Sequence, residues 1–185
     1  MSIAQYVWEM LVGGHGRMRK YGDIRSAERC EAGSLLDCYD SANQLHRSEA
    51  RAEGDLQTFE EILKRDVVFL IEDQDAVLGW ISYRVMSAYL LVTGLYVRKT
   101  NQREGAGQRL LDFVIHAASG RGLSLCVLKV LKNAPWAVSF YQKNGFFSVE
   151  LDSDDAVMQR DVELLLETTG LRKSNWSHLL VRLLS

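Results

Sequence analysis

The chain has 185 residues, of which 47% are hydrophobic and 25% charged, and its formal net charge is −2. This length suits a single globular domain with a real core, and the composition is that of a soluble protein. A net charge so close to zero gives no global field that would attract nucleic acid or a membrane surface. We therefore expect no nucleic acid and no membrane among the partners.

Cysteine usage and the N-terminal residues indicate the compartment. The three cysteines are odd in number and scattered, which argues against a disulfide framework, and no Cys/His group has the spacing of a zinc site. Residues 1–17 lack the basic start of a signal peptide, and no apolar run is long enough to span a bilayer. The sequence therefore predicts reduced thiols, no bound metal and a cytoplasmic protein, with the nucleus left open.

The first third of the chain reads as an extension followed by a strand and two helices. Residues 1–18 form the extension, because apolar residues at helical spacing are followed there by three glycines. A first strand is expected at 19–26. One-sided apolar spacing predicts a helix over 27–46, and after a polar loop at 48–55 a short helix over 56–64.

The middle of the chain has the pattern of a sheet. Residues 67–72 are β-branched and aromatic, which predicts a buried strand. A turn at 73–76 leads into a second strand at 77–86, antiparallel because the connection is so short. A third strand is expected at 90–97, followed by a glycine-containing loop and a helix that ends near Ser119.

The last third continues the alternation of strands and helices. Residues 123–130 are almost continuously apolar, as in a strand buried on both faces. The next helix has Pro135 in its first turn and Gly145 at its end. A final hairpin covers residues 146–162 and turns at 152–155.

Residues 163–185 form a C-terminal extension with an apolar stripe at helical spacing, made of Trp176, Leu179, Leu180, Leu183 and Leu184. So short a helix is unstable alone in water, so the stripe must pack against something. Packing on the core of the same chain is the favoured interpretation. An interface with a second copy, giving a homodimer, or with a partner chain is the alternative.

The strongest chemical signal is the loop at 102–107, Gln-Arg-Glu-Gly-Ala-Gly, between a strand and a helix. Its small residues let the backbone approach a ligand, and the first amides of the helix lack partners within it, which suits a pyrophosphate. A Rossmann fingerprint would need a third glycine where Leu110 stands, and the Gly-Lys-Ser/Thr of a Walker A loop is absent. Neither dinucleotide nor nucleoside triphosphate binding is supported.

Two patterns in this region resemble those of one enzyme family. Gln102, Gly105 and Gly107 follow the motif Q/R-x-x-G-x-G/A, five residues after a strand that ends at Val97. A second motif, N-x-x-x-A-x-x-F/L-Y-x-x-x-G-F, is matched by Asn133, Ala137, Phe140, Tyr141, Gly145 and Phe146. Together, in this order, they resemble the GNAT N-acetyltransferase superfamily over about residues 20–162.

The resemblance implies an α/β fold, with a mixed, twisted sheet of about seven strands, helices on both faces and two splayed central parallel strands. The acetyltransferase domain would cover 19–162. It implies acetyl-coenzyme A as co-substrate, without a metal. Its pantetheine arm would pair with the strand backbone of Leu95, Tyr96 and Val97. The remaining cofactor contacts would come from Gln102, Arg103, Glu104, Gly105, Ala106, Gly107, Gln108 and Asn133.

The same resemblance implies a general acid at Tyr141. When a neutral amine attacks a thioester, the sulfur leaves as a thiolate, and a nearby phenol can protonate it. The alternative is that Tyr141 is an amphipathic core residue of its helix. Asn133 has two roles open to it, a contact with the cofactor arm and a plain helix N-cap, and they can coexist.

No general base is assigned. A substrate ammonium, with a pKa near 10, must lose a proton before it attacks. The strand at 90–97 contains no carboxylate, which departs from many members of the family. Glu72 and Asp73 are candidates by position only, a solvated turn being the simpler interpretation, and none of the four histidines is assignable.

The predicted function is transfer of an acetyl group to a primary amine, which is a protein N-terminus, a lysine or a small molecule. The segments expected to bind this acceptor, about 45–56 and 150–160, carry no signature of its identity. The alternative is a catalytically silent sensor or scaffold that binds acyl-coenzyme A, and Tyr141 at the acid position argues against it.

Overall fold

The computed structural model describes residues 23–43, 55–74, 76–131, 134–149 and 155–161. Both predicted extensions and Asn133 lie outside these residues, as do 45–54 and 150–154 of the two acceptor segments. The chain divides into two compact units, Met1–Arg84 with Val92–Ala117 and Val85–Leu91 with Ala118–Ser185. Among the described residues, no helix is both long and apolar enough to cross a membrane.

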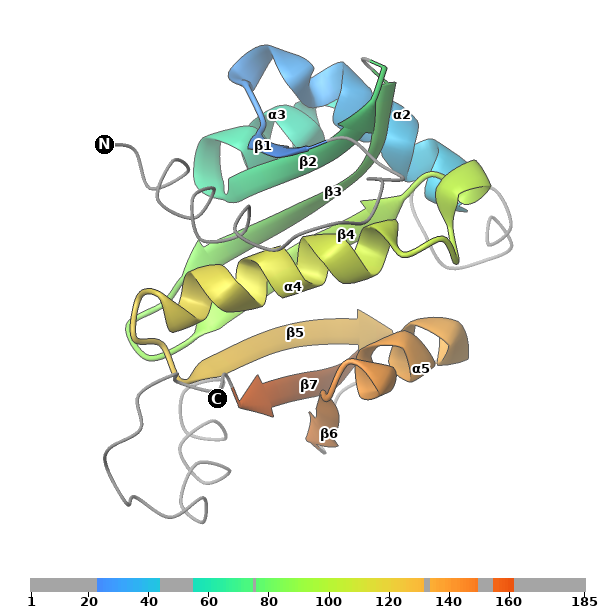
Figure 1. Cartoon of the computed structure of the whole chain (residues 1–185). Coiled ribbons are helices and arrows are strands. Elements are labelled where there is room, and N and C mark those ends of the chain that lie inside the picture. Colours follow the sequence, from blue (N-terminus) through green and yellow to red (C-terminus); the bar gives the residue numbers. More distant parts are fainter. Residues whose placement is uncertain (1–22, 44–54, 75, 132–133, 150–154, 162–185) are drawn as a thin grey trace, which may run out of the picture. The chain divides into compact units, whose positions relative to one another are not determined.

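The strands of the first unit lie in the order β1-β2-β3-β4 (Figure 1). They are β1 (Ile24–Ser26), β2 (Val67–Asp73), β3 (Ala76–Val85) and β4 (Leu90–Val97). The pairs β1–β2 and β2–β3 are antiparallel, as the short connection between β2 and β3 requires. The strands predicted at 67–72, 77–86 and 90–97 are therefore confirmed to within one residue at each end.

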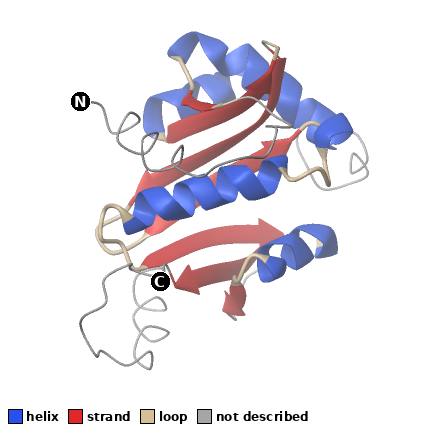
Figure 2. Ribbon diagram, in the orientation of Figure 1, coloured by secondary structure: helices blue, strands red, loops and turns tan. Residues whose placement is uncertain are grey.

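Helices cover both faces of this part of the sheet (Figures 1 and 2). On one face lie α2 (Ala32–Asn43) and α3 (Leu56–Arg65), and on the other lies α4 (Ala106–Ser119). The described residues of this unit also include two short 3-10 turns, η1 (Arg29–Glu31) and η2 (Lys99–Asn101). The prediction of helices on both faces of the sheet is thus confirmed for this unit.

Alternation along β2 and β3 explains why two layers of helix form. Val68, Leu70 and Trp80 belong to a buried cluster with α2 and α3, and the indole N–H of Trp80 donates to the Leu35 carbonyl at 3.1 Å. The intervening Phe69 points to the opposite face, where its ring lies 4.6 Å from that of Phe113 on α4. Successive side chains on a strand point to opposite faces, so each strand builds both cores.

The predicted helix at 27–46 begins later than expected. Residues 29–31 form the η1 turn, in which the Glu31 carboxylate accepts a hydrogen bond from the Glu28 amide at 2.7 Å, and the α-helix begins at Ala32. The helix predicted at 56–64 is confirmed as α3. Asp55 caps it by accepting a hydrogen bond from the Thr58 amide at 2.7 Å.

The described residues of the second unit that follow α4 form one helix and three strands. Its elements are β5 (Leu125–Leu131), α5 (Pro135–Lys143), β6 (Phe147–Val149) and β7 (Asp155–Asp161). The strands lie in the order β5-β7-β6, and both pairs are antiparallel. The final hairpin is confirmed as β6 and β7, which brings the strands in the described residues to the predicted seven.

Both ends of α5 carry residues that the sequence predicted. Ala134 holds the N-cap position, without a side-chain bond, and Asn133 lies outside the described residues. Pro135 occupies the first turn as predicted. Gly145 ends the helix with φ +80°, a conformation that glycine adopts without a steric penalty.

Substitution of Gly79 tests the packing between β3, β4 and α4. A Cβ at this position would lie 2.8 Å from the Tyr96 carbonyl oxygen and 3.3 Å from Leu110 Cδ1. We expect Gly79→Ala to lower the free energy of unfolding by about 1 to 2 kcal/mol, because the backbone of β4 must shift to relieve the clash. Chemical denaturation measures this change.

Gly33→Ala is the matched control, because a Cβ on Gly33 in α2 meets nothing within 4 Å. Alanine favours the helix, so this variant should keep its stability or gain up to about 1 kcal/mol. Equal losses of stability in the two variants would contradict the close approach of β4 at Gly79.

Candidate functional site

The loop between β4 and α4 is fixed to the end of β4 by hydrogen bonds. The Arg98 amide donates to the Leu78 carbonyl at 2.8 Å, and the Arg98 side chain donates from Nε to the Val77 carbonyl at 2.6 Å. The Gln102 side-chain amide donates to the Val97 carbonyl at 3.0 Å. Gln102, predicted as a cofactor contact, therefore ties the loop to the strand.

Gly105 is the residue from which α4 begins. Its carbonyl accepts the first bond of the helix, from the Arg109 amide at 3.0 Å, and its φ is +99°. Other residue types rarely adopt that conformation. A Cβ at Gly105 would meet no heavy atom within 4 Å, so the glycine is required by the backbone rather than by crowding within the protein.

The N-terminus of α4 has the properties of an anion site. The first amides of an α-helix have no acceptor within it, and the helix dipole favours negative charge there. Arg103, Glu104 and Gly105 are exposed, while Ala106 is buried beneath them. With open space beside Gly105, this helix N-terminus can accommodate an anionic group.

The backbone of β4 presents different groups to its two edges. The Tyr96 carbonyl points toward β3, since it lies 2.8 Å from the Cβ position of Gly79, and the Arg98 amide also points there. Backbone groups alternate along a strand, which directs those of Leu95 and Val97 to the other edge. Of the three residues predicted to pair with pantetheine, Leu95 and Val97 therefore have the suitable orientation.

The alternation of β4 is broken at Thr93 and Gly94. A Cβ on Gly94 would lie 2.8 Å from the Trp80 ring and 3.0 Å from Ser82 Oγ, and the Thr93 hydroxyl also lies 2.8 Å from Ser82 Oγ. Two successive residues thus face the same side of the sheet, which defines a local β-bulge. A glycine inside a predicted strand was the sequence signal for it.

The bulge brings Thr93 into a polar network around Asp66, whose side chain is fully buried. Asp66 Oδ1 accepts from Arg84 Nε at 2.6 Å and from Arg65 Nε at 3.1 Å, and Oδ2 accepts from the Thr93 hydroxyl at 2.7 Å. Burial alone would raise the pKa of Asp66, but these bonds outweigh it and hold the pKa below its usual value of 3.8. Asp66 is therefore a stably ionised carboxylate.

The pH dependence of stability tests this network. Because the folded-state pKa of Asp66 is depressed, its stabilising contribution is present above pH 3.8 and is lost as the pH falls below that value. We expect the free energy of unfolding to fall by up to about 1.4 kcal/mol per pH unit there on account of this group. Denaturant titrations between about pH 5 and about pH 2.5 measure the slope.

In that experiment Asp66→Asn should have a shallower slope than the unsubstituted protein. Asp73→Asn, at the exposed aspartate that ends β2, is the matched control and should keep the original slope. Identical slopes in all three proteins would show that Asp66 is not held in its ionised form by the fold.

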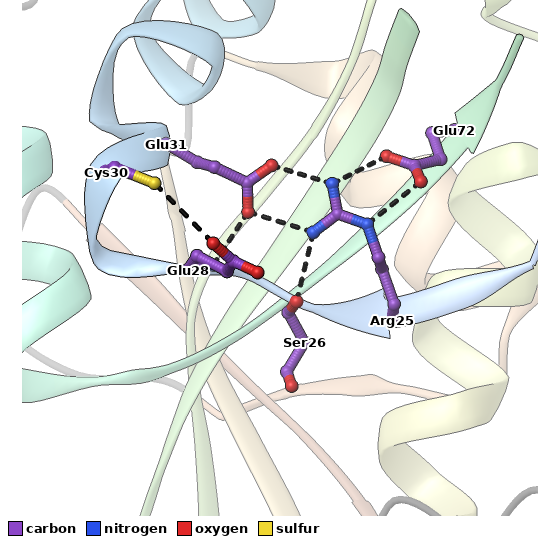
Figure 3. A network of polar contacts seen from close by, with 6 residues as sticks. All are labelled: Arg25, Ser26, Glu28, Cys30, Glu31 and Glu72. Carbon is purple, nitrogen blue, oxygen red and sulfur yellow. Dashed lines mark hydrogen bonds and ion pairs between the residues drawn. The ribbon is translucent and has the colours of Figure 1, made fainter. Parts of the chain in front are cut away.

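Glu72, a candidate base by position, forms an ion pair with Arg25. Its carboxylate accepts two hydrogen bonds from Arg25, at 2.9 and 2.8 Å, and the same guanidinium donates to Glu31 at 2.9 and 2.7 Å (Figure 3). The hydrogen bond from Arg25 is the main reason that the pKa of Glu31 is lowered. Both carboxylate oxygens of Glu72 are thus engaged by Arg25.

The other base candidates and the thiols are also constrained. His116 is exposed on α4, and its Nδ1 lies 2.7 Å from the Asp112 carbonyl of the same helix. All three cysteines are free, as predicted, and Cys38 and Cys126 are buried. Burial raises the pKa of the Cys38 thiol to about 12, which makes it a poor nucleophile.

Tyr141 lies on α5 in the second unit and is half-buried. Its ring packs edge-on against Phe140 at 5.2 Å and Phe146 at 5.7 Å, measured between ring centroids. Its carbonyl accepts hydrogen bonds from the amides of Asn144 and Phe146, both at 3.0 Å, at the end of the helix. The motif residues Phe140, Tyr141 and Phe146 are thus brought together by the turn at Gly145.

The part of the chain that the structure describes contains no group of three or more His, Cys, Asp or Glu side chains that could hold a metal ion. On the first unit, β4 directs backbone groups to the edge away from β3, and the N-terminus of α4 can bind an anion. On the second unit, Tyr141 is a half-buried tyrosine, and a tyrosine hydroxyl can donate a proton.

Residues 64–147 match a family model described as an acetyltransferase (GNAT) domain. Among solved structures, the chain is similar to the PaiA N-acetyltransferase of Thermoplasma acidophilum in complex with coenzyme A, with 17% identity, a TM-score of 0.67 and coverage of 75% of this chain and 98% of that one. It is also similar to the ribosomal-protein-S18-alanine N-acetyltransferase of Escherichia coli, with 18% identity, a TM-score of 0.65 and coverage of 80% and 99%. No curated protein sequence matches. The predicted fold is confirmed by these likenesses.

Proposed function

We propose that this chain, whose residues 64–147 match a GNAT acetyltransferase domain, is an acyltransferase that moves an acetyl group from acetyl-coenzyme A to a primary amine. The observation that carries it is the start of α4 at Gly105, where positive φ, exposed residues and open space meet.

The first unit would bind the co-substrate through its backbone. The amides from Arg103 to Gln108 would hold the pyrophosphate at the N-terminus of α4. The outward-directed groups of Leu95 and Val97 would pair with the pantetheine amides, as in strand addition. When bound, acetyl-coenzyme A supplies the acetyl group as an activated thioester.

Tyr141 would supply the proton that the leaving sulfur needs. In the reaction a bond forms between the amine nitrogen and the acetyl carbon, and the bond from that carbon to sulfur breaks. The nitrogen gives up one proton and the sulfur gains one. We assign the Tyr141 hydroxyl as the group that protonates the sulfur. The tyrosine would then regain a proton from solvent. The half-buried position of Tyr141 on α5 supports this role.

The acceptor class remains a primary amine, on a protein N-terminus, a lysine or a small molecule. The structurally similar Escherichia coli enzyme acts on the alanine of ribosomal protein S18, which makes an N-terminal alanine the first acceptor to test. We further propose a catalytic domain at 19–162 in a cytoplasmic protein, flanked by extensions at 1–18 and 163–185. The strands β1 and β7 lie close to these two boundaries.

A panel of amines tests the proposal. The protein is incubated with acetyl-coenzyme A and, in turn, a peptide with a free N-terminal alanine, an N-terminally blocked peptide with one lysine, a polyamine and an aminoglycoside. We expect one class to gain the mass of an acetyl group by mass spectrometry. Binding of acetyl-coenzyme A by calorimetry without turnover on any amine would favour the silent sensor or scaffold. Absence of binding would contradict the co-substrate assignment.

A further inference from the structure

The hydroxyl of Thr93 has its hydrogen-bond roles fixed by its neighbours. Asp66 is ionised and can only accept, so the single hydroxyl proton of Thr93 is donated to Asp66 Oδ2 at 2.7 Å. The contact of 2.8 Å with Ser82 Oγ must then be donated by Ser82. A hydroxyl oxygen has two lone pairs, and Ser82 occupies one of them. Within the part of the chain that the structure describes, the second lone pair of Thr93 is left to accept one further hydrogen bond.

Thr93 is exposed, although the groups that orient it are not. Ser82 is 1% exposed and the Asp66 side chain is fully buried. Burying a carboxylate costs free energy unless it is paired and hydrogen-bonded, and here two arginines and a threonine compensate it. The result is a hydroxyl on an exposed residue that a buried network holds in one orientation.

Thr93 also lies on β4 close to the residues proposed to pair with the cofactor arm. Thr93 lies two residues before Leu95, which corresponds to about 7 Å along a strand. Moving from the loop toward Thr93 follows β4 away from the anion site, past Val97 and then Leu95. A cofactor arm that pairs with Val97 and Leu95 would therefore run toward the bulge at Thr93 and Gly94.

We propose that the Thr93 hydroxyl oxygen accepts a hydrogen bond from an N–H of the acceptor amine, and that Asp66 and Ser82 are its positioning residues. A neutral amine attacks with its single lone pair, so a fixed acceptor for one N–H directs that lone pair away from Thr93. Because the proton of Thr93 is committed to Asp66, its hydroxyl offers this nitrogen only an acceptor. The inference rests on the proposed function, since it names part of the acceptor site.

Asp66 itself does not take the proton of the amine in this arrangement. Its two oxygens already accept from Arg84, Arg65 and Thr93, and its side chain is closed off from solvent. The depressed pKa makes it a weak base. Its contribution is to hold the hydroxyl of Thr93, which distinguishes it from a strand glutamate acting as general base.

The test replaces the hydroxyl by a methyl group of similar size. For Thr93→Val we expect kcat/KM for the amine of the panel that is acetylated fastest to fall about fivefold, in line with the loss of one hydrogen bond. The KM for acetyl-coenzyme A should not change. The affinity of the same amine for protein saturated with coenzyme A, measured by calorimetry, should fall in parallel. Thr93→Ser, which retains a hydroxyl, should recover most of the loss.

Two comparisons separate this role from a structural one. Thr58→Val, at an exposed threonine of α3, is the matched control and should leave every one of these values unchanged. An equal loss in Thr93→Val and Thr93→Ser, or a loss of acetyl-coenzyme A affinity with intact amine affinity, would overturn the inference. Unsubstituted protein that acetylates no amine would refute the proposed function itself, whereas active protein with an unimpaired Thr93→Val variant would refute only the role of Thr93.

Discussion

Replacement of Tyr141 by phenylalanine is expected to lower the rate of acetyl transfer by about 10² or more, with little change in acetyl-coenzyme A affinity. The substitution keeps the ring, whose edge-on contacts with Phe140 and Phe146 hold the end of α5. It removes only the hydroxyl, and general acid catalysis by a positioned group contributes about 10² to 10⁴ in rate. Single-turnover kinetics with the preferred amine measure the chemical step, and calorimetry measures the affinity.

Tyr89→Phe provides the control for Tyr141, because Tyr89 is a buried tyrosine of the same unit, packed with Leu125 and Val127. We expect its single-turnover rate to match that of the unsubstituted protein. A normal rate in Tyr141→Phe as well would mean that water or another group protonates the leaving sulfur. The alternative reading of Tyr141, as a packing residue of its helix, would then hold.

The second large effect is expected at Gly105. Gly105→Asp should weaken acetyl-coenzyme A binding at least tenfold, which corresponds to about 1.4 kcal/mol or more. An aspartate there places a negative charge at the proposed pyrophosphate site and must adopt φ +99°. The protein itself leaves room for a Cβ at this position. The loss should therefore come from charge and backbone strain.

Two variants separate the effect of charge from the effect of backbone strain at Gly105. Gly105→Asn has nearly the same size and the same backbone demand without the charge, so its affinity should lie between those of the unsubstituted protein and Gly105→Asp. Gly122→Asp makes the same change at another glycine with positive φ and open surroundings, after the end of α4, and should bind normally. Unchanged affinity in a folded Gly105→Asp variant would refute the pyrophosphate assignment.

Much of the fold could be predicted because its signals are local. The run at 67–72 is β-branched and aromatic, and the apolar spacing through Leu110, Leu111 and Val114 is helical, so β2 and α4 were evident from periodicity. The start of α4 was also predictable, because Gly105 signals a backbone conformation that other residues avoid. Element types were therefore reliable where the pattern was long.

The parts that could not be predicted depend on contacts between distant residues. Thr93 meets Asp66 across 27 positions, and Arg25 meets Glu72 across 47. Nothing in the local pattern around Asp66 distinguishes a buried, ionised carboxylate from an ordinary residue at the end of a helix. Position alone made Glu72 a candidate base. Its ion-pair partner, Arg25, lies on another strand and is far away in the sequence.

The ion pairs of Arg25 also bear on how the protein avoids aggregation. β1 is the outermost strand in the order of the first unit, and outermost strands expose backbone groups with which other chains can pair. Here that strand is only three residues long, and Arg25 stands at its centre, anchored to Glu31 and Glu72. An incoming strand would find few backbone groups and would have to desolvate this charge. The network thus protects the edge of the sheet against strand addition by a second molecule.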